Sequence, residues 1–190
     1  MDLWPLGAVI DAYQILGLER RLVLSDETLR EALREAGKRA HPDAGGMDGE
    51  FAGLREAVAI LSSPSQRLRH WLELRGVAIE IRGSIETSLM DLFAEVGAIT
   101  QQAEGLIRKR EEAKSALVRA MLEAETQLGR EAVERAIAQV DRRIAVVCAV
   151  FADFEVAEEP DLTVASMAVR NLAFLEKWRT GLRRAFSRLV

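Results

Sequence analysis

Apolar residues recur at spacings of three and four along most of this 190-residue chain, which is the period of an amphipathic helix. The clearest run is a heptad seam formed by Ile85, Leu89, Leu92, Val96, Ile99, Ala103 and Leu106. A similar seam includes Ala168, Leu172, Leu175, Leu182, Phe186 and Leu189. The chain has only four prolines, and few of its segments alternate in the two-residue period of a strand. The sequence therefore predicts an all-α fold.

Capping and breaking residues divide the first 76 residues into four short helices. The first is expected to open at Pro5 and end near Gly17. The second follows the capping residues Ser25 and Asp26 and ends before Pro42, because the residue before a proline disfavours the α conformation. Its predicted buried face consists of Leu29, Leu33, Ala36 and Ala40. A third helix begins at Asp48 and is broken at residues 62–64, and a short fourth ends at Gly76.

The rest of the chain reads as a linker over residues 77–83 and a C-terminal helical bundle over 84–190. The expected helices form an antiparallel three-helix bundle. The first starts after Ser84, with a bend or loop possible at 108–114; the others span about 130–154 and 162–189. Gly129 is expected to interrupt the helical pattern, and the acidic stretch 155–161 is expected to be a loop.

Composition excludes several kinds of site. One cysteine and two histidines leave no disulfide framework and make a metal site improbable, so neither a metal nor a cofactor is expected. Cys148 lies in an apolar run and reads as a small buried residue. A net charge of −4 gives no overall attraction to nucleic acid or to acidic membranes. Without a spanning segment or a leader peptide, the predicted location is cytoplasmic.

The triplet His41-Pro42-Asp43 follows a stripe of cations, Arg30, Arg34 and Lys38, spaced four apart on one helix face. Such a face can dock on an acidic partner surface, and Asp43 can accept hydrogen bonds or pair with an arginine there. A neighbouring stripe of Glu27, Glu31 and Glu35 leaves the alternative that these charges only pair along a solvated helix. No nucleophile and orienting acid accompany His41, so an enzyme is not expected.

Several motifs resemble a known family. The stretch DAYQILGL at 11–18, the triplet, and AVAILSSPSQR at 57–67 resemble a J-domain. RLRHWLELRG at 67–76 and TSLMDLFAEV at 87–96 are similar to the HscB-type co-chaperones of iron–sulfur cluster assembly. VRNLAFLEKWR at 169–179 is similar to a C-terminal helix of the same family. The resemblance covers nearly the whole chain in order, with residues 1–76 as the J-domain and 84–190 as the client-binding bundle.

The resemblance implies a function. The family's J-domain stimulates the ATPase of a DnaK/HscA-type chaperone, here through His41, Pro42 and Asp43 with Arg30, Arg34 and Lys38. Its bundle binds the scaffold protein IscU, here through Leu89, Met90, Phe93 and Phe174, and the co-chaperone itself holds no cluster. Independently, Met90 and Phe93 flank the heptad seam and can form an exposed patch, unless a third helix covers them.

The chain also departs from the family pattern, and other functions stay open. Ala44 follows the triplet where the family often has a cation, and Ala94 and Gly97 stand where its client face carries acids. The alternatives are a J-domain co-chaperone for an unrelated client, or a helical adaptor whose J-like module no longer works. Nucleic-acid binding through the arginine-rich end (Arg179, Arg183, Arg184 and Arg188) lacks an aromatic platform or groove-reading motif.

Overall fold

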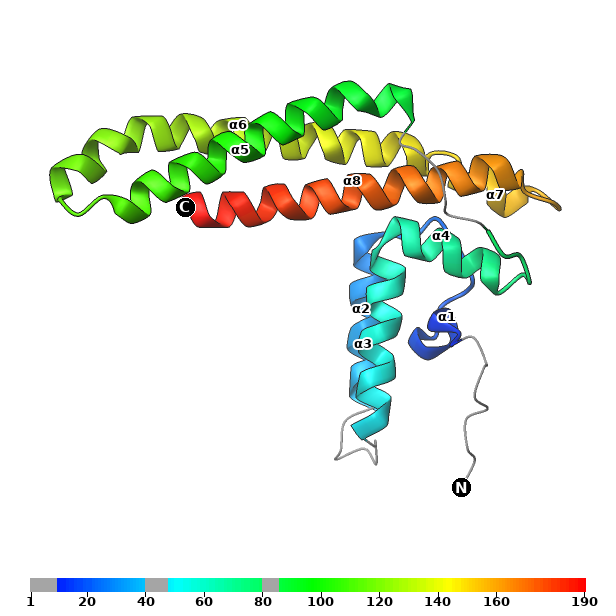
Figure 1. Ribbon diagram of the computed structural model, residues 1–190. Helices are drawn as coiled ribbons and strands as arrows, with labels where there is room; N and C mark the ends of the chain where they lie inside the picture. Colours follow the sequence, from blue (N-terminus) through cyan, green and yellow to red (C-terminus); the bar gives the residue numbers. More distant parts are fainter. Residues whose placement is uncertain (1–9, 40–47, 80–85) are drawn as a thin grey trace. The chain divides into compact units, whose positions relative to one another are not determined.

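The structure is a computed structural model that describes residues 10–39, 48–79 and 86–190 (Figure 1). Over these ranges every regular element is a helix, which confirms the predicted all-α class. The elements are α1 (Ala12–Leu16), α2 (Asp26–Arg39), α3 (Asp48–Ser62), α4 (Pro64–Glu73), the 3₁₀ turn η2 (Thr87–Leu89), α5 (Met90–Glu112), α6 (Ala116–Cys148), α7 (Phe151–Val156) and α8 (Leu162–Leu189).

The chain forms two compact units. Unit 1 contains Met1–Arg82 together with Cys148–Val169, and unit 2 contains Gly83–Val147 together with Arg170–Val190. Helix α8 therefore supplies its first turns to unit 1 and the remainder to unit 2. The boundaries at 76 and 84 stay a prediction, to which the structure adds that residues 148–169 group with the N-terminal helices.

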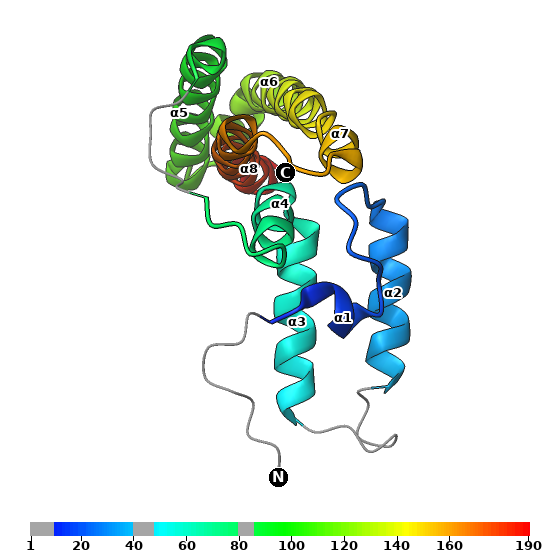
Figure 2. The same cartoon turned by 90° about the vertical axis from the view of Figure 1, so that its right-hand side faces the viewer.

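Unit 1 is built on an antiparallel hairpin of α2 and α3, with α1 packed against α3 (Figure 2). Among the hairpin residues whose burial the structure describes, the buried ones are Leu29, Ala32 and Ala36 from α2 and Leu54, Ala57 and Leu61 from α3. The prediction that Leu33 faces the core is wrong, because Leu33 is 36% exposed while Ala32 is buried. Ala40 lies outside the described residues. The buried face of α2 is thus narrow and lined mainly by alanine, which lets the two helices pack closely.

Helix α1 is a single capped turn. The Asp11 carboxylate accepts hydrogen bonds from the backbone N–H groups of Tyr13 (3.0 Å) and Gln14 (3.2 Å), which fixes the start of the helix. Gly17 ends it at φ +70°, in the left-handed region that favours glycine. The helix starts at Ala12, well after the predicted opening at Pro5, which lies outside the described residues.

Unit 2 is a three-helix bundle of α5, α6 and the later part of α8, as predicted (Figure 1). The heptad seam of α5 is largely buried at Leu89, Val96, Ala103 and Leu106. Its partners in the core are Val133, Ala136 and Val140 from α6 and Leu172, Leu175 and Leu182 from α8. The loop predicted near 108–114 falls between the end of α5 at Glu112 and the start of α6 at Ala116.

Gly129 does not interrupt a helix, contrary to the prediction. It lies inside α6, and a Cβ atom placed there would come within 2.6 Å of Leu106 Cδ1 on α5. The glycine is therefore explained by close packing between two helices. The helix predicted to run to residue 154 is instead divided, because α6 ends at Cys148 and α7 begins at Phe151. Cys148 is half-buried at that break.

Candidate functional site

The predicted docking cations lie on the exposed side of α2. Arg34 pairs with Glu31 (2.5 Å) and Glu35 (2.9 Å), and Lys38 pairs with Glu35 (3.0 Å). Arg30 is exposed and has no ion-pair partner among the described residues. The pairing along a solvated helix, raised as the alternative to docking, is therefore real for two of the three cations.

These pairs leave the cations available to a stronger partner. The hydrogen bond and charge of Arg34 lower the pKa of Glu31, and the same pair raises the pKa of Arg34. Both side chains are solvated, and exposed pairs of this kind add little to stability and exchange readily. A more acidic partner surface can displace the glutamates without breaking the fold. The triplet His41-Pro42-Asp43 lies outside the described residues, so its role stays a prediction.

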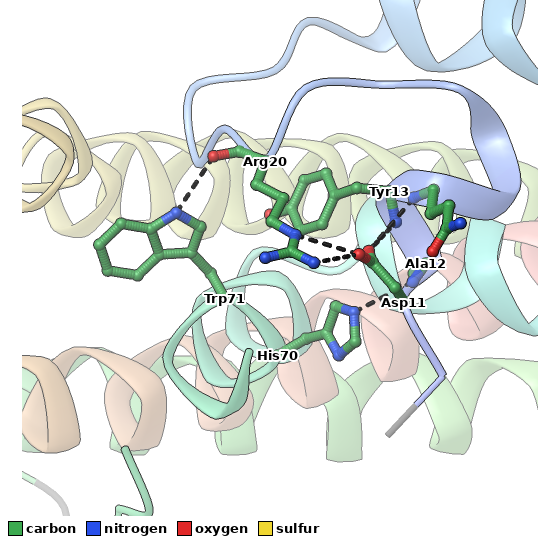
Figure 3. A network of polar contacts seen from close by, with 7 residues as sticks. Asp11, Ala12, Tyr13, Arg20, His70 and Trp71 are labelled. Carbon is green, nitrogen blue, oxygen red and sulfur yellow. Dashed lines mark hydrogen bonds and ion pairs between the residues drawn. The ribbon is translucent and has the colours of Figure 1, made fainter. Parts of the chain in front are cut away.

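A polar network fixes α1 against α4 and so holds the N-terminal side of unit 1 in place (Figure 3). Besides capping α1, the Asp11 carboxylate accepts two hydrogen bonds from the Arg20 guanidinium, at 2.7 and 3.0 Å. The Trp71 indole donates to the Arg20 backbone carbonyl (3.2 Å), and the Arg75 guanidinium lies 4.3 Å from the centre of the Trp71 ring. One arginine thus links the start of α1 to the buried face of α4.

His70 is the acceptor at the centre of this network. Its Nε2 accepts a hydrogen bond from the Ala12 backbone N–H (3.1 Å), and its ring stacks on Tyr13 with centroids 5.9 Å apart (Figure 3). An amide can only donate, so Nε2 carries a lone pair and the imidazole is neutral. Burial lowers the pKa of His70, in agreement with that state. With its lone pair engaged by the Ala12 amide, His70 positions α1.

Glu155 was expected in a loop and instead lies in a helix, where it makes a partly buried contact. It lies in the last turns of α7, and its carboxylate accepts hydrogen bonds from the backbone N–H groups of Leu22 and Val23, the latter at 2.9 Å. The ring of Phe151 on the same helix lies 5.9 Å from the Arg67 guanidinium. These contacts belong to unit 1, and the only sequence signal for them was the apolar pair Phe151 and Phe154 ahead of the acidic stretch.

Unit 2 carries an exposed aromatic face on α5 and α8. Met90 is 48% exposed and Phe93 is 46% exposed, so the described helices leave about half of each side chain open on this flank of the seam. The Phe93 ring contacts Trp178 (centroids 5.5 Å apart), and Trp178 in turn lies 6.4 Å from Phe174. We call Met90, Phe93, Phe174 and Trp178 the aromatic face. The structure thus brings together three of the four residues predicted for client contact.

The fourth predicted residue, Leu89, is 1% exposed and lies in the core of the bundle. Its burial favours a packing role, and its assignment to client contact stays a prediction. Trp178 was missed by the sequence analysis, although it stands four positions after Phe174 and so shares its side of α8. Aromatic residues that are half open and stacked on one another are the type that anchors protein interfaces.

The arginine-rich end of α8 is engaged within the bundle. Arg179 and Arg183 contact Asp141 on α6, at 3.3 and 3.9 Å, and Arg188 pairs with Glu111 on α5 (2.8 Å). These arginines therefore have a structural explanation that needs no nucleic acid. Across the described ranges, no three His, Cys, Asp or Glu side chains gather as metal ligands, and no helix has the length and apolar character to span a bilayer.

Comparison with known proteins relates this fold to a solved structure. No protein-family model matches the chain. The solved structure of chaperone HscB from Vibrio cholerae superposes with a TM-score of 0.55, over 95% of this chain and 99% of that one, at 18% sequence identity. This chain has the HscB fold. In terms of the HscB fold, α1 to α4 are the J-domain arrangement and α5, α6 and α8 are the C-terminal bundle.

A curated relative adds a sequence match. The tetratricopeptide repeat and J domain-containing co-chaperone DNJ1 of Cryptococcus neoformans var. grubii is 38% identical over 60 residues. The match takes in 32% of this chain and only 11% of DNJ1. The matched segment therefore spans about a tenth of that larger protein. The likeness to HscB, by contrast, takes in nearly the whole length of this chain.

Proposed function

We propose that the protein is an HscB-type co-chaperone. In this proposal unit 1 docks on a DnaK/HscA-type chaperone and stimulates its ATPase, while unit 2 carries an iron–sulfur scaffold protein of the IscU type. The observation that carries it is the aromatic face, where Met90 and Phe93 are exposed and Phe174 is half-buried beside Trp178, because these three residues are the positions that the family motifs match. The protein itself catalyses no reaction, and its cytoplasmic location stays a prediction.

The docking chemistry falls to α2 and the triplet that follows it. Among the described residues Arg30 has no ion-pair partner, and the charges of Arg34 and Lys38 are paired with solvated glutamates. An acidic chaperone surface would be steered to these cations, which raises the association rate at low salt. The triplet at the end of α2 then reaches the chaperone, with the carboxylate of Asp43 as the acceptor.

Single-turnover ATP hydrolysis by the cognate chaperone tests the docking half of the proposal. The wild-type protein should stimulate hydrolysis, and His41→Gln should abolish the stimulation. Arg30→Ala should weaken it mainly at low salt, whereas Arg21→Ala, which removes an exposed arginine of unit 1 outside α2, should not. Absence of stimulation by the wild type, or equal stimulation by the wild type and His41→Gln, would reject the J-domain role.

Calorimetry with the purified scaffold protein tests the client half. Phe93→Ala and Trp178→Ala should each weaken binding by about tenfold or more, as expected for aromatic anchors. Val146→Ala is the matched control, because Val146 is 60% exposed on α6, which contributes nothing to the aromatic face. If the scaffold binds and neither aromatic change weakens that binding, the scaffold uses another surface.

A J-domain co-chaperone for a different client is the second candidate. The observation in its favour is that Ala94 and Gly97 are exposed beside the aromatic face, where the family's client face carries acids. A client recognised here would depend more on apolar contact and less on charge. ATPase stimulation without measurable scaffold binding would favour this candidate over the first.

A further inference from the structure

The first half of α6 presents a second apolar surface, separate from the aromatic face. Leu117, Met121 and Leu128 are 72%, 73% and 64% exposed, and the exposed Ala124 lies between them. Spacings of four, three and four place these four residues on one side of the helix. Single exposed apolar residues are ordinary on a protein surface, but a continuous stripe of this kind marks an interaction site. We call these four residues the α6 stripe.

The bundle itself does not use the α6 stripe. The buried residues of α6 are Thr126, Val133, Ala136, Val140 and Ile144, which follow their own seam on another side of the helix. Val118, which is 44% exposed, lies next to the stripe and extends it. A groove of about 380 Å³ between α5 and α6 adjoins it, with Leu128 on one wall and Ile99 and Leu106 among its other lining residues. The apolar stripe therefore adjoins a groove of mixed lining, in which Lys109 and Glu125 pair at 2.8 Å.

We propose that the α6 stripe binds the α6 stripe of a second copy of this chain, with the two helices antiparallel. A two-fold axis between Leu122 and Glu123 places Leu117 of one copy opposite Leu128 of the other. The same register sets the large Met121 against the small Ala124, which is the packing that lets two helices approach closely. This inference does not depend on the proposed chaperone or client.

Charge at the ends of the stripe favours the antiparallel arrangement. In the same register Lys114, which precedes α6, comes to the end of the helix where Glu131 of the other copy lies beside its own Arg135 (4.0 Å). A parallel pair would instead oppose lysine to lysine and glutamate to glutamate, and would leave Ala124 facing Ala124 across a gap. Like charges placed opposite one another disfavour association. The stripe is thus complementary to itself in the antiparallel direction, and the pairing places the same patch of both copies in an isologous two-fold interface.

The size of the surface sets the strength of the dimer. Four apolar residues from each copy make an interface at the small end of the range for specific association. The dissociation constant should therefore be on the order of micromolar or weaker. Such a dimer forms at high local concentration and dissociates on dilution.

Sedimentation equilibrium of the full chain over a wide concentration range tests the proposal. The wild type should pass from monomer to dimer, and Met121→Glu with Leu128→Glu should raise the dimer dissociation constant by about a hundredfold or more. Val146→Glu introduces the same charge at another exposed apolar position of α6 and should leave association unchanged. A wild type that stays monomeric, or a double variant that associates as the wild type does, would overturn the inference.

Cysteine cross-linking tests the register and direction. Cys148 is the only cysteine in the chain, so a Cys148→Ser background contains no thiol. Mixing the Leu117→Cys and Leu128→Cys proteins in that background should give a disulfide-linked pair. Neither protein alone should link, because like positions in an antiparallel pair lie about 16 Å apart along the helix. Links within each protein alone, with no disulfide between positions 117 and 128 in the mixture, would show a parallel pair and refute the proposed arrangement.

Discussion

Lowering the pH should loosen α1 from α4, because His70 can hold the Ala12 amide only while its Nε2 is unprotonated. The Ala12 N–H donates to Nε2 at 3.1 Å, and His70 is 4% exposed. A proton on Nε2 would replace the acceptor by a second donor and leave the amide without a partner. A buried donor that loses its acceptor costs about 1–3 kcal/mol.

The direction of the pH effect follows from the pKa of His70. Burial lowers it from its ordinary value of 6.5; the charges of Asp11 and Glu73 oppose the shift and that of Arg20 adds to it. The unfolded chain therefore binds a proton more readily than the folded one as the pH falls. The stabilisation is fully present above pH 6.5 and is lost as the pH falls from there through the folded-state pKa. A pKa lowered by one corresponds to about 1.4 kcal/mol of stabilisation.

Nuclear magnetic resonance of the full chain measures both quantities. The His70 ring should titrate below 6.5, and the protection of the Ala12 amide against hydrogen exchange should fall over the same pH range. His70→Phe keeps an aromatic ring and removes the acceptor, so it should reduce Ala12 protection by about five- to 150-fold at neutral pH and abolish the pH dependence.

The amide of Leu72, within α4, is the internal control and should keep its protection in the variant. A His70 that titrates at or above 6.5, or an Ala12 amide equally protected in wild type and variant, would refute the reasoning. Loss of protection at both amides would indicate that the whole helix has loosened, and the acceptor role would then be unsupported.

Three further predictions concern packing and caps. Gly129→Ala should destabilise the bundle by about 1–3 kcal/mol through the clash with Leu106. Gly105→Ala, whose new methyl group meets nothing within 4 Å, should instead stabilise it by about 0.5–1 kcal/mol. Thermal unfolding followed by circular dichroism measures both, and an equal rise of the midpoint temperature in the two variants would contradict the close approach at Gly129. Glu155→Ala should cost about 1–3 kcal/mol and speed hydrogen exchange at the Leu22 and Val23 amides, and unchanged exchange there would contradict the contact. Asp11→Ala should cost about 1–2 kcal/mol at pH 7 in denaturant unfolding. Burial raises the pKa of Asp11, but Arg20 and the backbone N–H groups of Gln14 and Tyr13 together lower it by more. The wild-type advantage should therefore persist above 3.8 and shrink as the pH falls further, and an advantage independent of pH would count against these contacts.

The long helices were predictable because their signals are local. The last helix was expected at about 162–189 and is observed as Leu162–Leu189, where Asp161 caps its first turn through the Thr163 and Val164 amides. Gly129 was misread because a glycine costs about 1 kcal/mol in a helix whatever its surroundings. The contact that explains it, with Leu106 on α5, joins residues far apart in the chain and leaves no trace in local periodicity.

The same distinction between local signals and tertiary contacts applies to the candidate site. The heptad seam of α5 implied that Leu89 is buried and that Met90 and Phe93 flank it, and the exposed fractions agree. The family motif instead grouped all three as contact residues, since a motif records which residue types stand at which positions and not which of them reach the surface. Trp178 completes the aromatic face from α8, so it becomes visible only when the bundle brings α5 and α8 together. Periodicity therefore separates packing from contact within one helix, while the composition of a face built from two helices depends on their tertiary pairing.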